Sequence, residues 1–141
     1  MRRGRLNVRL DTARHAEVLD ASAVLAYVYR EPGYERAGDA IFAGSVISAV
    51  NLAEVHSTLA EDGVASSEVV ERLRVSGLEV EPFDANDAAT AGRLRPSTRA
   101  LGLSLADRAC LALAIRLGRP VLTTDRDLAR ADVGVDMRVL R

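Results

Sequence analysis

The fold is set by residues 17–25, which read Glu17-Val18-Leu19-Asp20-Ala21-Ser22-Ala23-Val24-Leu25. A short apolar run ends on the carboxylate Asp20, and a helix-like pattern begins directly after it. In open α/β sheets, functional sites lie just beyond the carboxyl ends of the strands. Asp20 is therefore expected at the edge of a sheet, where other polar side chains can join it.

The same order of residues returns near the end of the chain, where Val121-Leu122-Thr123-Thr124 leads into Asp125. Between these two stretches, apolar residues recur at helical spacing in segments that begin at capping residues and end at Gly or Pro. We expect helices at 22–30, 34–42, 49–61, 66–77, 84–95 and 105–117, and further strands at 46–47, 78–83 and 135–140. This alternation predicts an α/β fold, a single α/β/α domain with a mostly parallel sheet.

Length and composition narrow the class of protein. A chain of 141 residues that is 48% hydrophobic is the right size for one core. Its apolar runs fall short of the roughly 20 residues that a membrane span needs, so we expect a cytoplasmic protein with no membrane association. The single cysteine, Cys110, lies in an apolar run and is expected to be a small buried hydrophobic residue.

The N-terminus differs from the rest of the chain in charge. Residues 1–14 contain five arginines and one aspartate, giving +4, whereas the net charge of the whole chain is −1. We expect residues 1–16 to form a basic, flexible extension that either contacts nucleic acid or is a solvated leader, and residues 17–141 to form the domain.

Four carboxylates are expected to meet at one edge of the sheet. Asp20 and Asp125 end strands, Asp107 lies in the first turn of a helix, and Glu54 lies on a helix face with Asn51 and Thr58 that is expected to point away from the core. Carboxylates about 4 Å apart repel by very roughly 4 kcal/mol per pair at an effective dielectric of 20, so such a cluster needs a cation or raised pKa values. Oxygen ligands favour Mg²⁺ or Mn²⁺ over zinc.

Each carboxylate also has a purely structural interpretation. Asp107 completes a capping box with Ser104, and Asp127 has the same spacing from Thr124. Asp20 is placed to cap the helix that follows it, and Glu54 is suited to a solvated helix face. The functional interpretation gains weight because two separate strands end in a carboxylate, at the place where the fold puts a site.

Four short motifs, in this order and at this spacing, resemble those of PIN-domain ribonucleases, and most of all VapC toxins of bacterial toxin–antitoxin pairs. The motifs are Val18-Leu19-Asp20-Ala21-Ser22-Ala23, Ile47-Ser48-Ala49-Val50-Asn51-Leu52-Ala53-Glu54-Val55, Gly102-Leu103-Ser104-Leu105-Ala106-Asp107 and Val121-Leu122-Thr123-Thr124-Asp125-Arg126-Asp127. The resemblance runs from about residue 17 to residue 140. Residues 1–16 depart from it, because the first strand usually begins the chain in this family.

The resemblance implies a metal-dependent endoribonuclease that uses Mg²⁺ or Mn²⁺, acts on RNA, forms a homodimer and is neutralised by an antitoxin. By motif match, the catalytic and metal-binding carboxylates are Asp20, Glu54, Asp107 and Asp125. Ser22 and Thr123 are implied as polar supports, and Asp127 as an additional acid.

Other enzymes with acids at strand ends fit the sequence less well. Phosphoacceptor domains, haloacid-dehalogenase-like phosphatases and P-loop nucleotide-binding proteins all depend on a lysine, and every basic residue of this chain other than histidine is arginine. The remaining alternative is a non-catalytic PIN-like module that binds RNA or a protein partner.

Overall fold

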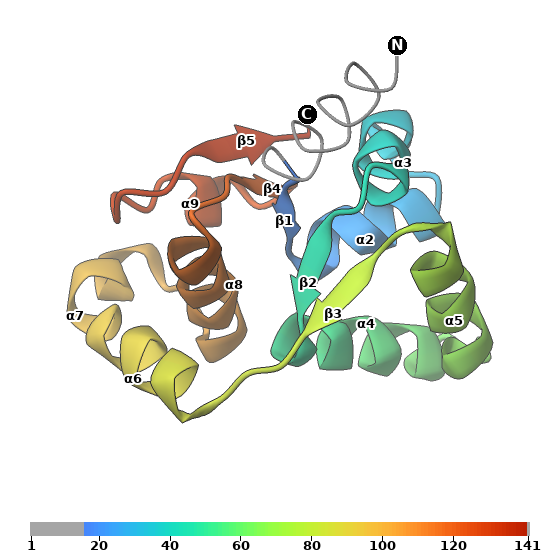
Figure 1. Ribbon diagram of the computed structural model, residues 1–141. Coiled ribbons are helices and arrows are strands. Elements are labelled where there is room, and N and C mark those ends of the chain that lie inside the picture. The colour runs from blue at the N-terminus through green and yellow to red at the C-terminus, as the bar shows by residue number, and fades with distance from the viewer. Residues whose placement is uncertain (1–15, 141) are drawn as a thin grey trace, which may run out of the picture.

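The computed structural model describes residues 16–140, in which helices enclose one central sheet (Figure 1). The predicted basic extension at 1–16 lies outside the described residues except for Ala16. The sheet has five strands in the order β3-β2-β1-β4-β5, and all four pairings are parallel. The strands are β1 (Val18–Leu19), β2 (Val46–Ser48), β3 (Glu79–Glu81), β4 (Val121–Thr123) and β5 (Met137–Val139). The predicted α/β fold with a mostly parallel sheet is confirmed.

The helices lie on both faces of the sheet, with α2 to α5 on one face and α6 to α8 on the other (Figure 1). They are α2 (Ala21–Val28), α3 (Tyr34–Phe42), α4 (Ala49–Glu61), α5 (Ser66–Ser76), α6 (Ala85–Arg93), α7 (Arg95–Thr98), α8 (Leu105–Leu117) and α9 (Arg126–Ala129). A short 3-10 helix, Arg99–Leu101, joins α7 to the segment before α8.

Each of the central strands supplies one apolar side chain to each layer, because successive residues of a strand point to opposite faces. Leu19 of β1 packs into the core beneath α2, α3, α4 and α5, whereas its neighbour Val18 packs into the core beneath α8. Ile47 and Val46 of β2 divide in the same way. An apolar core therefore packs against each face of the sheet, and the two cores together hold the strand ends in fixed positions.

The predicted helix at 84–95 is wrong at its C-terminal end, because α6 stops at Arg93 and a second helix, α7, starts at Arg95. Proline is tolerated in the first turn of a helix, where its missing N–H needs no partner, so Pro96 begins α7 instead of only ending α6. The capping box that begins α6, formed by Asp84 and Asp87, is confirmed.

A helix that crosses a membrane needs roughly 20 consecutive, mostly apolar residues. Among residues 16–140, no helix is both long enough and apolar enough to cross a membrane.

Candidate functional site

Asp20 is buried at the carboxyl end of β1, with 4% of its surface exposed. It is the N-cap of α2, where Oδ1 accepts hydrogen bonds from the Ala23 N–H at 3.0 Å and from Ser22 Oγ at 2.7 Å. Oδ2 accepts from Thr123 Oγ1 at 2.6 Å. Burial raises the pKa of Asp20, although the three donors oppose this shift.

Ser22 and Thr123 connect the ends of β1 and β4 through their hydroxyl groups. Thr123 Oγ1 donates to Asp20 and accepts from the Asp125 N–H at 2.9 Å, while Ser22 Oγ accepts from the Thr124 N–H at 3.0 Å. The two hydroxyl oxygens lie 3.3 Å apart. Both side chains that the resemblance implied as supports therefore contact Asp20 directly, and Thr123 also fixes the backbone of Asp125.

Asp107 lies in the first turn of α8 and forms the expected capping box. Its Oδ2 accepts from the Ser104 N–H at 2.9 Å, and its own N–H donates to Ser104 Oγ at 3.1 Å. Its other oxygen, Oδ1, accepts no hydrogen bond from residues 16–140. The structural and functional interpretations of Asp107 are therefore compatible, because capping uses only one of the two oxygens.

Glu54 lies in the second turn of α4, and its Oε1 faces the side-chain amide of Asn51 at 3.4 Å. Our expectation that Asn51 lies on a face pointing away from the core is wrong, because only 1% of its surface is exposed. This part of α4 packs against α8, so a polar helix face became an interior contact. Helical spacing alone placed Asn51 beside Glu54 but gave no sign of its burial.

The charges of three carboxylates act on one another at this edge of the sheet. The pKa of Glu54 is raised, first of all by burial. The hydrogen bond from Asn51 lowers this pKa, whereas the charges of Asp107 and Asp20 raise it. The charge of Asp107 likewise adds to the raised pKa of Asp20. Among the described residues, none of the three carboxylates forms an ion pair with an arginine or a histidine. Within the described part of the chain, these three carboxylates therefore have no ion-pair partner.

Asp125 and Asp127 are placed differently from these three. Asp125 is the N-cap of α9, where its Oδ1 accepts from the N–H groups of Asp127 and Leu128. It adjoins Asp20 through the shared contact with Thr123. The Asp127 carboxylate is exposed and lies 3.8 Å from Arg130. The structure thus brings Asp20, Glu54 and Asp107 into electrostatic contact, and it places Asp127 in an exposed ion pair.

The donor chemistry of this edge suits a hard cation. Within the described part of the chain, no three Asp, Glu, His or Cys side chains converge closely enough to form a ready-made metal cluster. Mg²⁺ does not require one, because it usually keeps several waters and binds through one or two carboxylates. Carboxylate oxygens without a hydrogen-bond donor, such as Asp107 Oδ1, fit such an ion. His56 has no part in the site, because its Nδ1 lies 2.8 Å from Ser66 Oγ at the start of α5.

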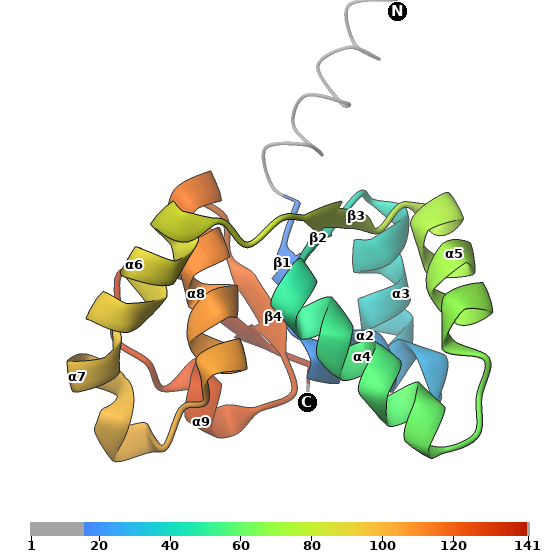
Figure 2. The ribbon, with the colours of Figure 1, turned by 90° about the horizontal axis from the view of Figure 1, so that it is seen from below.

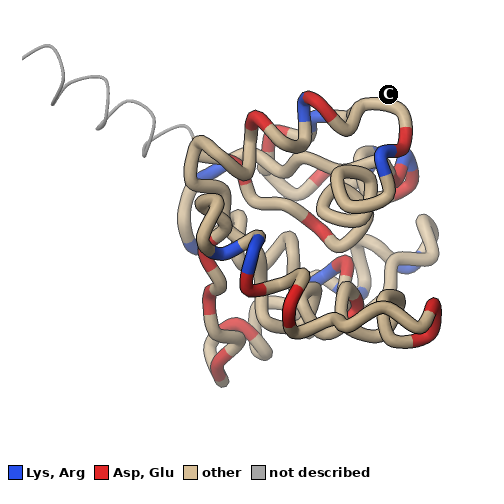
Figure 3. The backbone as a smooth tube through the Cα atoms, turned by 90° about the vertical axis from the view of Figure 1, so that its right-hand side faces the viewer, with Lys and Arg blue, Asp and Glu red and all other residues tan. Residues whose placement is uncertain are grey.

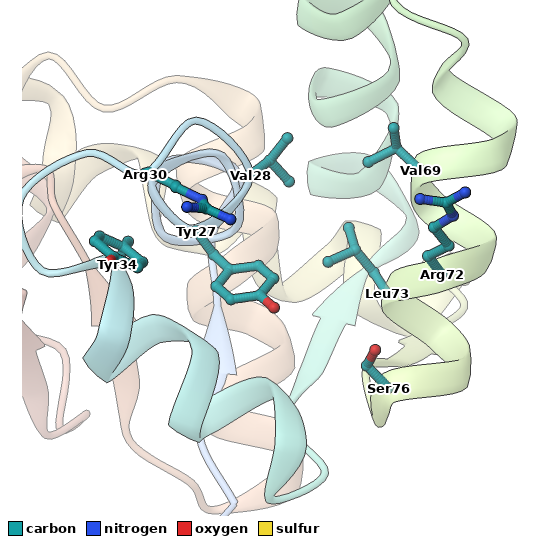
Figure 4. A pocket seen from close by; sticks show the side chains of 8 residues that line it. All are labelled: Tyr27, Val28, Arg30, Tyr34, Val69, Arg72, Leu73 and Ser76. Atoms are coloured by element: carbon teal, nitrogen blue, oxygen red, sulfur yellow. The ribbon is translucent and has the colours of Figure 1, made fainter.

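A separate groove of about 540 Å³ lies between α2, α3 and α5 (Figure 4). Its apolar lining comes from Val28, Val69 and Leu73, and Tyr27 extends from α2 into the space that faces α5. Arg30 and Arg72 also line it, and neither forms an ion pair with a described residue. Acidic and basic positions both occur on this side of the molecule (Figure 3).

The sequence model of the PIN domain matches residues 18–134, so the chain belongs to the PIN domain family. The match begins at β1 and ends after α9, and it includes each carboxylate described above. None of the curated proteins matches the chain.

Solved structures with the same fold include chains of toxin–antitoxin complexes. A chain of a DNA-bound VapBC complex from Salmonella typhimurium has a TM-score of 0.68 and 20% identity, covering 90% of this chain and 99% of that one. A chain of a toxin–antitoxin complex from Klebsiella pneumoniae has a TM-score of 0.62 and 20% identity, covering 84% and 94%. A chain of FitAB bound to a DNA fragment has a TM-score of 0.59 and 24% identity, covering 85% and 93%.

Proposed function

We propose that this protein is a metal-dependent endoribonuclease that hydrolyses phosphodiester bonds of RNA in the cytoplasm. One observation carries the proposal: Asp20, Glu54 and Asp107 come from three different elements, act on one another electrostatically, and have no cationic partner among the described residues. A purely structural role offers no benefit for gathering like charges, because it raises their electrostatic energy. A bound Mg²⁺ or Mn²⁺ ion offers one.

In this proposal one or two of the carboxylates of Asp20, Glu54 and Asp107 bind the ion directly, and the others act on it through its bound waters. Asp125 completes the acidic set. When bound, the ion would supply Lewis acidity that polarises the phosphate and lowers the pKa of a water molecule. The protein contributes orientation. Thr123 and Ser22 hold the two oxygens of Asp20 in one position, and the Ser104 N–H does the same for one oxygen of Asp107. We assign Asp127 an accessory role at the rim of the site.

We also propose that the enzyme is the toxin of a toxin–antitoxin pair and that an antitoxin protein neutralises it. Two solved structures with chains of the same fold support this assignment: the toxin–antitoxin complex from Klebsiella pneumoniae and the VapBC complex from Salmonella typhimurium. The groove between α2, α3 and α5 offers an apolar floor and two arginines, which suits an antitoxin segment with apolar and acidic side chains (Figure 4).

A homodimer is part of the same proposal. Phe42 and Val75 are 58% and 80% exposed, and they lie near the adjoining C-terminal ends of α3 and α5. Exposed apolar patches are typical of association surfaces, and we assign the dimer contact to these two helix ends. Sedimentation of the purified protein at micromolar concentration tests this, and a monomer at all accessible concentrations would contradict it.

The activity is tested by incubating RNA with the protein in Mg²⁺, in Mn²⁺ and in chelator, beside the Asp20→Asn variant. We expect cleavage by the wild-type protein with either ion, and none in chelator. RNA binding without cleavage under all conditions would instead support the alternative, a non-catalytic binding module.

A further inference from the structure

Asn51 is a buried polar side chain beside Glu54 that the proposed chemistry does not yet use. It lies in the first turn of α4, is 1% exposed, and contacts α8 across the interface between the two helices. Figure 2 shows α4 and α8 on either side of the strand ends. Asn51 therefore sits between the helix that carries Glu54 and the helix that carries Asp107.

The side-chain amide of Asn51 joins these two helices through one nitrogen. Nδ2 donates to the backbone oxygen of Ala106 at 3.1 Å and approaches Glu54 Oε1 at 3.4 Å. Ala106 is the residue before Asp107, so the amide links the Glu54 carboxylate to the backbone that positions the Asp107 carboxylate. An amide flip would turn Oδ1 toward two acceptors, so the orientation with Nδ2 toward them is fixed by the chemistry of the contacts.

The oxygen of the Asn51 amide, Oδ1, lowers the stability of the folded protein. Asn51 Oδ1 is buried without a hydrogen-bond partner among the described residues. Leaving a buried acceptor unpaired costs free energy, whereas an apolar residue of similar size avoids that cost. The Ala106 carbonyl does not depend on Asn51 either, because within α8 it accepts the N–H four residues further on. Stability alone thus gives a weak reason for asparagine at this position.

We infer that Asn51 is a positioning residue for the metal site, holding the Glu54 carboxylate at a fixed place relative to Asp107. This inference rests on the proposed metal-dependent function. Donors that orient a ligating carboxylate act from outside the set of ligands, and their loss typically lowers metal affinity or activity 10- to 100-fold. Asn51 touches neither the ion nor the RNA in this role, and it acts only through Glu54.

The test compares the wild-type protein with Asn51→Leu, which has a similar size and lacks the amide. Two quantities are measured: the melting temperature in chelator, and the metal affinity, from the rise in melting temperature as Mn²⁺ or Mg²⁺ is added. We expect Asn51→Leu to melt at or above the wild-type temperature in chelator, and to bind the ion roughly 10- to 100-fold more weakly. Ser57→Ala is the matched control, because its hydroxyl bonds only the Ala53 carbonyl on the exposed side of the same helix.

The outcomes distinguish a failure of the role assigned to Asn51 from a failure of the proposed metal-dependent function. If the wild-type protein binds the ion and Asn51→Leu binds it equally well, the inference is overturned and the proposed function stands. A lower melting temperature in chelator with unchanged affinity also overturns it, since Asn51 would then only join two helices. If the wild-type protein shows no response to either ion, both fail. Should Asn51→Leu not fold, Asn51→Ser gives the same comparison.

Discussion

Glu17 and Asp20 flank the short strand β1 and are almost equally buried, but Glu17 is neutralised by arginines and Asp20 is not. Glu17 is 5% exposed, and its Oε2 receives Arg36 at 2.6 Å and Arg138 at 3.3 Å. Asp20 is 4% exposed and receives two hydroxyl groups and one backbone N–H, none of which carries a full charge. One end of the strand is a closed ion-pair cluster, and the other retains negative charge.

The difference fits the proposed role of Asp20, because a carboxylate without an arginine partner stays available for a ligand. Arginine would satisfy Asp20 but would also occupy its oxygens with a permanent cation. Helix N-termini stabilise an anion without doing so, through their free N–H groups and the positive end of the helix dipole. Asp20, Asp107 and Asp125 all lie at helix N-termini, those of α2, α8 and α9.

The strongest test of this contrast is the activity of Asp20→Asn beside Glu17→Gln. Because loss of an outer-shell contact already lowers activity 10- to 100-fold, we expect loss of a ligating charge to lower RNA cleavage by more than about 100-fold. Glu17→Gln is expected to cleave at near the wild-type rate below its melting temperature. Equal losses in the two variants would remove the distinction between the two ends of β1.

The capping boxes of α6 and α8 give a second pair with the same local motif. Asp87 is neutralised by Arg116 at 3.0 Å, whereas the Asp107 carboxylate has no cation among residues 16–140. We expect Asp107→Asn to abolish cleavage and leave the metal-free melting temperature unchanged or slightly higher. Ser104→Ala removes the cap but keeps the charge, so it should cost about 1 kcal/mol of stability and largely retain activity.

The stability of the variants, measured by thermal or urea unfolding, distinguishes Asp87 from Asp107. We expect Asp87→Asn to be destabilising, since it leaves the Arg116 guanidinium with a weaker partner, and to retain cleavage. Near wild-type cleavage by Asp107→Asn in saturating Mg²⁺ or Mn²⁺ would reduce Asp107 to a capping residue.

A smaller effect is expected for the stability of Glu17→Gln. The substitution weakens two charged hydrogen bonds, but both arginine side chains are 44% exposed and regain water. We therefore expect a loss of about 1–2 kcal/mol in the free energy of unfolding, measured in urea. An unchanged midpoint with an unchanged slope would show that the ion-pair cluster contributes nothing to the fold.

The smallest effect concerns the pH dependence of the metal-free protein. The pKa values of Asp20 and Glu54 are raised in the folded state, first of all by burial. Each group therefore favours the folded state most below its unfolded pKa, and this contribution is lost as pH rises through the raised pKa. We expect the wild-type protein to lose stability relative to Asp20→Asn as pH increases above about 4. Saturating Mg²⁺ should reverse the trend.

The order of the strands and of the longer helices was predictable because each of these segments carries its own signal, whereas the four-residue helices α7 and α9 were not expected. Ser48 and Ser104 cap helices where the sequence indicated, and the apolar runs that end at Asp20 and Thr123 are strands. The burial of Asn51 was not predictable, since it depends on Ala106, a residue 55 positions away. The groove was not predictable either, because it forms only where three helices that are separate in the sequence come together.

The reactivity of the Cys110 thiol can be used to measure how often the interior around α8 opens. It is the chain's only cysteine, it is fully buried in α8, and burial raises the pKa of its thiol well above the ordinary range. The charges of Asp20, Asp107 and Glu54 add to that shift. A thiol reagent therefore reacts only when the packing around α8 opens, and its rate of labelling measures how often that happens. If the proposed ion binds these carboxylates, we expect it to hold this layer closed and to slow the labelling of Cys110.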